Sequence, residues 1–276
     1  MVLQEKVGED GRIARYKARL VAHGFRQKPG IDFTDTYSPT ISYAAIRIVQ
    51  SKAAAEDKEI SQLDIVTPFL ESRIDEELYL KLPKHFVISR GGRVELEVHD
   101  PEGKAKKPDT QVVVKLKKSL YGLKQAGHNW YHTVELHFIN QMKMKPSLYE
   151  VGIYISQSGA TIIAWVDDLL LIGMKRKVAE IKNCIREPFQ IKDLGNVKFF
   201  LSMLVERDRE RRTLYLSQQT YLTKILSRFS MENCKGCSTP LHPKTKLHRR
   251  TEAEESTDMR AYQEAVGSLT YAAITP

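Results

Sequence analysis

Two adjacent acidic residues between two apolar segments constrain this chain more than any other feature. Residues 161–166, Thr-Ile-Ile-Ala-Trp-Val, lead into Asp167 and Asp168, and Leu-Leu-Leu-Ile-Gly follows at 169–173. Two apolar strands with so short a link predict a tight antiparallel hairpin. Adjacent like charges beside apolar strands are unfavourable unless a cation offsets them. The pair is equally explained by the ordinary preference of Asp for turns.

A third carboxylate occurs in a similar setting. Asp64 lies in Gln-Leu-Asp-Ile-Val at 62–66, within an apolar run that predicts a buried strand over 60–69. If this strand neighbours the hairpin, Asp64, Asp167 and Asp168 converge, and hard oxygen ligands of this kind suit Mg²⁺ or Mn²⁺. Two such ions about 3.5–4 Å apart can stabilise both the attacking and the leaving oxygen of a phosphoryl transfer.

The composition narrows the class of protein. The 276 residues suggest one or two domains, and a net charge of +9 favours a polyanionic partner such as nucleic acid, although solubility explains the charge equally well. Three cysteines fit a reducing, intracellular setting rather than a disulfide scaffold. No apolar run approaches the ~20 residues of a membrane span, and the first residues do not resemble a signal peptide.

Hydrophobic periodicity predicts a mixture of helices and strands. Apolar spacing near 3.6 residues predicts three helices, at 128–142, 178–185 and 221–229, and the content of Ala and Ile predicts a fourth at 43–56. Strands are expected at 12–24, 60–69 and 111–116 in addition to the hairpin. Segment 89–110 has the composition of a surface loop, and 242–258 that of a linker. Because strands and helices do not alternate regularly, we expect the α+β class.

Several ordered blocks resemble the reverse transcriptase domain of copia-type LTR retrotransposons. The blocks cover nearly the whole chain and lie at 16–25, 37–39, 62–64, 119–126, 165–168, 193–195, 234–241 and 265–269. The resemblance implies a right-hand polymerase fold with palm, fingers and a partial thumb. It implies a domain over 1–241, with fingers and palm to about 205 and a thumb-like part over 206–241. Residues 242–276 would link to an absent ribonuclease H domain, and we expect an N-terminally truncated domain.

The resemblance also implies a reaction. Asp64, Asp167 and Asp168 would be the catalytic carboxylates and would hold two Mg²⁺ or Mn²⁺ ions, mainly through Asp64 and Asp167 with Asp168 in support. A primer 3′-hydroxyl would attack the α-phosphate of a deoxynucleoside triphosphate (dNTP) on an RNA or DNA template, and pyrophosphate would leave.

Further roles carry over one residue at a time. Arg19 would touch the incoming triphosphate, Phe69 would stack under its sugar, and Gln125 would lie beside the sugar. The alternatives are an exposed strand face for Arg19, core packing for Phe69 and a buried, hydrogen-bonded amide for Gln125. Weaker candidates for phosphate contact, which are equally explained as solvated charges, are Lys17, Lys124, Lys175 and Arg176.

The chain departs from the family pattern at several positions. Pro68 replaces the usual Ala and removes a backbone N–H that would meet the triphosphate. Glu71 adds a negative charge. Gly127 and His128 replace a usual Pro-Arg, which removes a cation. Ser202 replaces a Gly and would be strained if that position has positive φ. Trp165 replaces the hairpin Tyr, which is a tolerable exchange of aromatic rings.

Three hypotheses remain open at this stage. The first is an RNA-directed DNA polymerase, joined in its parent polyprotein to ribonuclease H and integrase and acting in the cytoplasm, in virus-like particles or in the nucleus. The second is a nucleic-acid-binding remnant with impaired catalysis, and the third is a basic globular protein without either activity. A zinc site from Cys234, Cys237, His242 and His248 is disfavoured because both histidines lie in the linker.

Overall fold

The computed structural model describes residues 1–7, 12–82, 96–99, 113–241, 244–246, 248 and 258–274. Contacts within the chain divide it into two compact units. The first comprises residues 1–49 and 58–196, and the second comprises 50–57 and 197–276. Both combine helices with antiparallel strands, so the predicted α+β class is confirmed.

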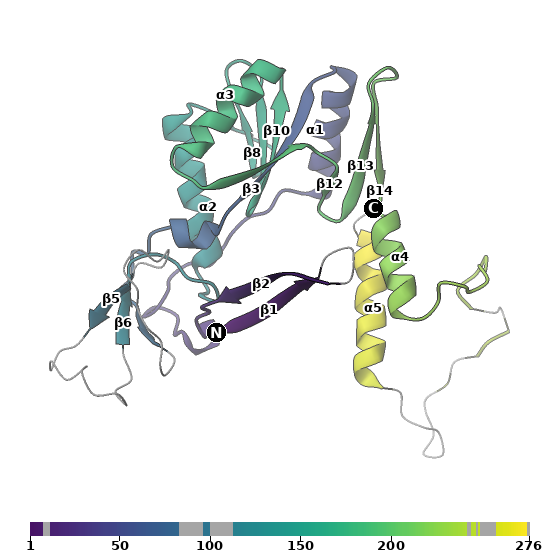
Figure 1. The fold of residues 1–276 in the computed structure, drawn as a ribbon, viewed down its shortest axis with the longest axis horizontal. Helices are drawn as coiled ribbons and strands as arrows, with labels where there is room; N and C mark the ends of the chain where they lie inside the picture. The colour runs from purple at the N-terminus through teal and green to yellow at the C-terminus, as the bar shows by residue number, and fades with distance from the viewer. Residues whose placement is uncertain are drawn as a thin grey trace. The chain divides into compact units, whose positions relative to one another are not determined.

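The first unit is built on a six-stranded antiparallel sheet (Figure 1). Its strands, in spatial order, are β11 (Ile191–Asn196), β3 (Glu59–Ile65), β10 (Asp168–Gly173), β9 (Thr161–Trp165), β8 (Ile153–Ile155) and β7 (Lys145–Pro146). The strand that carries Asp64 therefore lies directly beside the acidic hairpin, although about a hundred residues separate them in the chain. This neighbour relation, on which the predicted site depends, is present.

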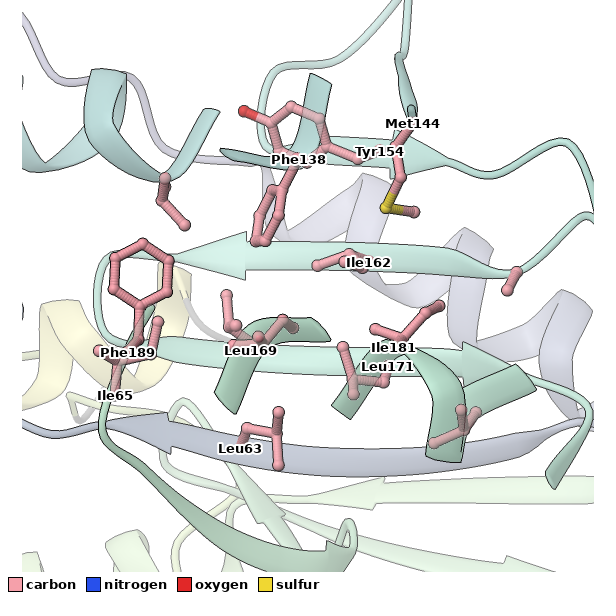
Figure 2. Packing of buried hydrophobic residues seen from close by; sticks show 14 of the residues in the cluster. Leu63, Ile65, Phe138, Met144, Tyr154, Ile162, Leu169, Leu171, Ile181 and Phe189 are labelled. Atoms are coloured by element: carbon pink, nitrogen blue, oxygen red, sulfur yellow. The ribbon is translucent and has the colours of Figure 1, made fainter. Parts of the chain in front are cut away.

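The main hydrophobic core lies on one face of this sheet (Figure 2). Leu63 of β3 and Leu169 and Leu171 of β10 are fully buried there. They pack with side chains of α2 (Ala126–Leu136) and α3 (Lys175–Arg186). Because successive side chains of a strand point to opposite faces, the core also fixes which residues point away from it. A register slip of one residue would turn the acidic side chains into this core.

Several predicted elements end differently from expectation; the strand predicted over 12–24, for example, stops at Arg19. Strand β3 stops at Ile65 rather than Phe69, because Thr67 adopts a left-handed φ of 56° and Pro68 begins a short 3-10 helix, η2 (Pro68–Glu71). Proline cannot donate to a sheet ladder, which explains the early end. The helix predicted over 128–142 is α2 followed by a π-helical turn, η3 (His137–Gln141).

The remaining strands of the first unit form two small sheets. A hairpin pairs β1 (Val2–Val7) with β2 (Ile13–Arg19), and a short 3-10 turn, η1 (Gly24–Arg26), follows. The second sheet has the order β4 (Tyr79–Lys81), β6 (Val113–Leu116) and β5 (Leu96–His99). The prediction of an irregular loop over 89–110 is therefore wrong at β5, and the rest of that segment lies outside the described residues.

The second unit contains a three-stranded sheet and two helices. Its strands are β12 (Phe199–Phe200), β13 (Met203–Asp208) and β14 (Thr213–Ser217), and its helices are α4 (Gln219–Arg228) and α5 (Met259–Ile274). The longer of the two segments of this unit begins at Val197. Helix α1 (Tyr43–Ala55), predicted over 43–56, contributes its last residues to this unit.

The prediction that 242–276 is a linker is wrong for its last part, which forms α5. The Tyr221 hydroxyl donates to the Ser268 carbonyl at 3.2 Å, and the Tyr221 and Tyr271 ring centroids are 4.9 Å apart. Arg228 and Glu264 form an ion pair at 3.2 Å. These contacts join α5 to α4 across the linker. Within the described part of the chain, no helix combines the length and apolar character needed to cross a bilayer.

The turn between β12 and β13 confirms the strain expected at Ser202. Leu201 and Ser202 have φ of 47° and 67°, a conformation for which Asn-Gly is preferred. We expect Ser202→Gly to raise the free energy of unfolding of this unit by about 0.5–1 kcal/mol in urea denaturation. The gain should be larger in a Tyr271→Phe background, because the Ser202 Oγ accepts a 3.1 Å hydrogen bond from the Tyr271 hydroxyl that Gly loses. A loss of stability in both backgrounds would contradict the strain argument.

Candidate active site

Two of the three carboxylates face each other across neighbouring strands. Asp64 of β3 is the direct register partner of Asp168 of β10, and both point away from the core that contains Leu63 and Leu169. The Gln62 amide nitrogen donates to Asp168 Oδ1 at 3.3 Å. The register of one strand pair therefore brings together carboxylates that are far apart in sequence.

The third carboxylate is held in a strained hairpin. Val166 and Asp167 form a two-residue link between the paired residues Trp165 and Asp168, which confirms the predicted tight hairpin. Val166 has a φ of 54°, a rare value for a β-branched residue. The Trp130 indole N–H donates to the Val166 carbonyl at 2.6 Å.

The hairpin is also bonded to the neighbouring strand. The Ile65 N–H donates to the Asp167 carbonyl at 2.8 Å. This bond and that from Trp130 sustain the strained backbone, so Asp167 is fixed beside the end of β3.

Asp64 and Asp167 line the same cavity of about 570 Å³. Its other lining residues include Tyr121 and four cationic side chains, which are Arg15, Lys17, Arg19 and Lys192. Strand β2 supplies three of these cations and β11 supplies the fourth. The cavity therefore sets two carboxylates against several positive charges, an arrangement that can hold a polyanion together with divalent cations.

The carboxylates disfavour one another's charge. Burial raises the pKa of Asp64, and repulsion by Asp167 raises it further, while Lys192 and Lys17 oppose the change. Burial also raises the pKa of Asp168 against the hydrogen bond from Gln62, with Asp167 and Asp64 adding to the rise. A bound cation would relieve this accumulated negative charge.

The donor set fits Mg²⁺ or Mn²⁺ only with help from a substrate. Among the described residues, no three or more Asp, Glu, His or Cys side chains form a group that could hold an ion unaided. Mg²⁺ is characteristically bound by one or two carboxylates together with substrate phosphates and water. The carboxylates of Asp64 and Asp167 provide that number of protein ligands.

Replacing Asp168 by Asn should stabilise the fold at neutral pH. The pKa of Asp168 is raised in the folded state, so at a pH above this raised value the ionised carboxylate lowers the free energy of unfolding. This destabilisation disappears as the pH falls below the ordinary pKa of Asp, where the carboxyl group is protonated in both states. We expect Asp168→Asn to raise Tm by about 2 °C at pH 7.5 in thermal unfolding. The gain should shrink towards pH 4.

Asp193→Asn is the matched control for that substitution. Burial tends to raise the pKa of Asp193, but hydrogen bonds from Lys182 and the Gly195 N–H outweigh it, and the net pKa is lowered. A lowered pKa contributes stability above the ordinary pKa of Asp, so this variant should lower Tm at pH 7.5. The same sign of change in both variants would contradict the electrostatic account.

Arg19 lines the cavity with Tyr121 beside it, while its contact with a triphosphate stays a prediction. The Arg19 guanidinium carbon is 5.2 Å from the Tyr121 ring centroid. Burial raises the pKa of the Tyr121 hydroxyl, and its hydrogen bond with Arg19 opposes that rise. The two side chains therefore form one cationic, aromatic wall of the cavity.

Phe69 and Gln125 are not among the residues that line the cavity. The Phe69 ring packs edge-on against Tyr121 at 5.2 Å and against the main core. Gln125 is 1% exposed, accepts a hydrogen bond from the Gln27 amide at 3.0 Å and donates to the Asp32 carbonyl at 2.8 Å. Phe69 therefore packs in the core, and Gln125 is a buried, hydrogen-bonded amide, as the alternative explanations had it. Contact of either residue with a nucleotide stays a prediction.

Three of the weaker candidates lie elsewhere, and only Lys17 lines the cavity. Lys175 and Arg176 begin α3, after the end of β10 that lies ~17 Å from its Asp168 end. Arg176 pairs with Glu180 at 3.3 Å. Lys124 is exposed and its Nζ lies 5.2 Å from the Phe33 ring centroid.

Sequence reasoning missed several residues of the site, among them Arg15 and Tyr121 of the cavity wall, and Lys192 and Trp130. Lys192 is the register partner of Asp64 on the opposite side from Asp168, and Trp130 holds the hairpin through its indole N–H. The apolar period of α2 predicted that Trp130 is buried, but no sequence signal pointed to its partner. The position of Lys192 follows from pairing of β11 with β3, which the sequence did not reveal.

Two departures from the family pattern find local partners. The Glu71 carboxylate forms an ion pair with Lys118 at 3.6 Å, so its charge is offset. His128 Nδ1 lies 2.7 Å from the Tyr37 carbonyl oxygen, which gives this ring a structural contact of its own. Cys234 and Cys237 are exposed free thiols, and His242 of the disfavoured zinc site lies outside the described residues.

A strand carboxylate, an acidic hairpin and several cationic side chains therefore meet at one cavity. Residues 2–243 match the family described as "Reverse transcriptase (RNA-dependent DNA polymerase)", and the chain belongs to this family.

The relatives are transposon proteins. Over 99% of its length the chain is 37% identical to a retrovirus-related Pol polyprotein from transposon TNT 1-94 of Nicotiana tabacum. It is 34% and 33% identical, again over 99% of its length, to those from transposons RE2 and RE1 of Arabidopsis thaliana. These copia-type relatives confirm the resemblance seen in the sequence. The chain spans 20%, 18% and 18% of their respective lengths, and no solved structure matches it.

Proposed function

We propose that this chain catalyses RNA-directed DNA synthesis as the reverse transcriptase part of a copia-type Pol polyprotein. Asp64 and Asp167 would hold two Mg²⁺ or Mn²⁺ ions, and Asp168 would support them. The observation that carries the proposal is the convergence of Asp64 with the strained acidic hairpin at a cavity lined by cations, in a chain of this family.

The chain's own residues would position both reactants. Arg19, Lys17 and Lys192 face the cavity and would neutralise the triphosphate. The hydrogen bonds from Trp130 and Ile65 would hold the hairpin in place while the charged triphosphate binds and pyrophosphate leaves. The bound ions would lower the pKa of the primer hydroxyl and offset charge on the phosphates. The 3′-oxygen would then bond to the α-phosphorus as its proton leaves to solvent and the bond to pyrophosphate breaks.

The proposal extends to architecture and partners. We assign palm and fingers to the first unit and a partial thumb to the second. The partners would be a primed RNA or DNA template, dNTPs, and the ribonuclease H and integrase domains of the parent polyprotein. The protein would act inside the cell, in the cytoplasm, in virus-like particles or in the nucleus.

The decisive experiment is dNTP incorporation on a primed homopolymer in Mg²⁺ or Mn²⁺. Wild-type protein should incorporate nucleotide, and an Asp167→Asn/Asp168→Asn variant prepared in the same way should not. Equal incorporation by both would identify a contaminating polymerase and refute the proposal.

One observation favours the second candidate function, a nucleic-acid-binding remnant with impaired catalysis. Pro68 lines the cavity at the first position of η2, where it has no N–H to offer a phosphate. A lost charge-assisted hydrogen bond weakens binding about 10- to 150-fold. Pro68→Ala should therefore lower the KM for dNTP by up to that factor.

Pro146→Ala, at an exposed proline of β7, is the control for this measurement and should leave KM unchanged. An unchanged KM in a folded Pro68→Ala protein would mean that the missing N–H does not limit nucleotide binding.

A further inference from the structure

The turn η1 carries a ladder of stacked side chains on the surface. The His23 and Phe25 ring centroids are 5.3 Å apart with the planes inclined by 25°, and the Arg26 guanidinium carbon lies 5.8 Å from the Phe25 centroid. Phe25 is 77% exposed, which is unusual for so large an apolar ring. We call these three residues the η1 platform.

The η1 platform is fixed with respect to the active-site cavity. Gly24, between His23 and Phe25, is buried so closely against Gly122 that a Cβ at Gly24 would overlap the Gly122 carbonyl. The Ala22 N–H donates to the Tyr121 carbonyl at 2.7 Å. Since Tyr121 lines the cavity with Asp64 and Asp167, the platform is attached to the same loop.

A second cavity, of about 470 Å³, is lined partly by residues of this segment, and Leu20 lines both cavities. His23, Arg26, Tyr79 and Lys81 line it. Its carboxylate comes from Asp32, whose Oδ2 already accepts a 2.7 Å hydrogen bond from the Lys28 N–H.

The backbone of Lys124 is bonded to the segment that follows the platform, and its Nζ lies 5.2 Å from the Phe33 ring centroid. The Lys124 N–H donates to Gln27 Oε1 at 2.8 Å, and Gln27 follows directly after η1. The surface therefore combines an exposed aromatic ring with several cations.

We propose that the η1 platform and this second cavity hold the unpaired part of the template strand next to the active site. One base would stack on Phe25, while Arg26, Lys81 and Lys124 would contact the backbone phosphates. Aromatic rings among cations are the usual means of binding single-stranded nucleic acid without sequence preference. The inference rests on the proposed function, because that function supplies a template.

The test measures binding rather than synthesis. Fluorescence anisotropy would compare one primer–template duplex carrying a template overhang of about ten nucleotides with the same duplex carrying one nucleotide. Base stacking on an aromatic ring accounts for about 5- to 150-fold in affinity. Phe25→Ala should weaken binding of the long overhang by a factor in this range and leave the short one unchanged. For the long overhang, Arg26→Gln should reduce the slope of the logarithm of the binding constant against the logarithm of the salt concentration by about one.

Matched variants keep the result interpretable. Phe25→Trp should retain the affinity, and Tyr149→Ala, at a ring that is 95% exposed on another loop, should change neither overhang. Equal weakening of both overhangs by folded Phe25→Ala, or no weakening of either, would overturn the inference. Absence of dNTP incorporation by the wild type would instead refute the proposed function, and the binding comparison would still be readable.

Discussion

Replacing Asp64 by Asn should reduce dNTP incorporation by at least about 10³-fold while the protein remains folded. The amide keeps the size of the side chain but removes a negative ligand from the cavity that Asp64 shares with Asp167. The fold should tolerate the change, because burial and repulsion by Asp167 already raise the pKa of Asp64. Single-turnover incorporation with excess template separates this loss from weaker template binding.

Asp193→Asn provides the control for Asp64→Asn. Asp193 also lies in a strand of the same sheet, but its carboxylate pairs with Lys182 at 2.8 Å and Arg186 at 3.3 Å and does not line the cavity. Its incorporation rate should stay within a few-fold of the wild type. A wild-type rate for Asp64→Asn would show that this carboxylate takes no part in the chemistry.

Gly122→Ala should have the largest effect on stability, about 3 kcal/mol in urea denaturation. Gly122 has a φ of 89°, and an added Cβ would overlap the Ala22 carbonyl and lie 2.7 Å from Val21 Cγ1. Relief requires the segment after β2 to separate from the Tyr121 loop. Because that segment and loop line the cavity, incorporation should fall together with stability.

Gly30→Ala separates backbone strain from steric overlap. Gly30 has a similarly positive φ of 74°, but no atom lies within 4 Å of an added Cβ. This variant should lose only about 1 kcal/mol. Equal losses in the two variants would mean that close approach of the two segments contributes nothing.

Local patterns predicted the parts of this fold that depend on local physics. The apolar runs on either side of Asp167 predicted the hairpin, helical spacing predicted α2 and α3, and the content of Ala and Ile predicted α1. Helix α5 and most of the short strands, including β5 and β11, were missed, because pairing and packing with distant segments rather than strong local periodicity stabilise them. The end of β3 was misplaced because the strand was predicted to run through Pro68, which cannot donate to a ladder, and because the left-handed backbone of Thr67 has no sequence signature of its own.

The sequence likewise predicted some residues of the candidate site and not others. The sequence, through its ordered blocks, identified the family and named Asp64, Asp167 and Asp168 as a set. It could not predict that Lys192 would pair beside Asp64, or that Gln125 would be enclosed by Gln27 and Asp32.

By itself, the sequence determined the chemistry that the chain carries: three carboxylates, an excess of cations and the segments that form strands and helices. Only the tertiary structure decided which of these groups meet. The register of β3 between β10 and β11 places Asp64 beside Asp168 and Lys192, while the bond from Trp130 fixes the hairpin. The physical reason is that strand pairing and side-chain hydrogen bonds join residues distant in the chain, and their free energy depends on the whole packed core rather than on neighbouring residues.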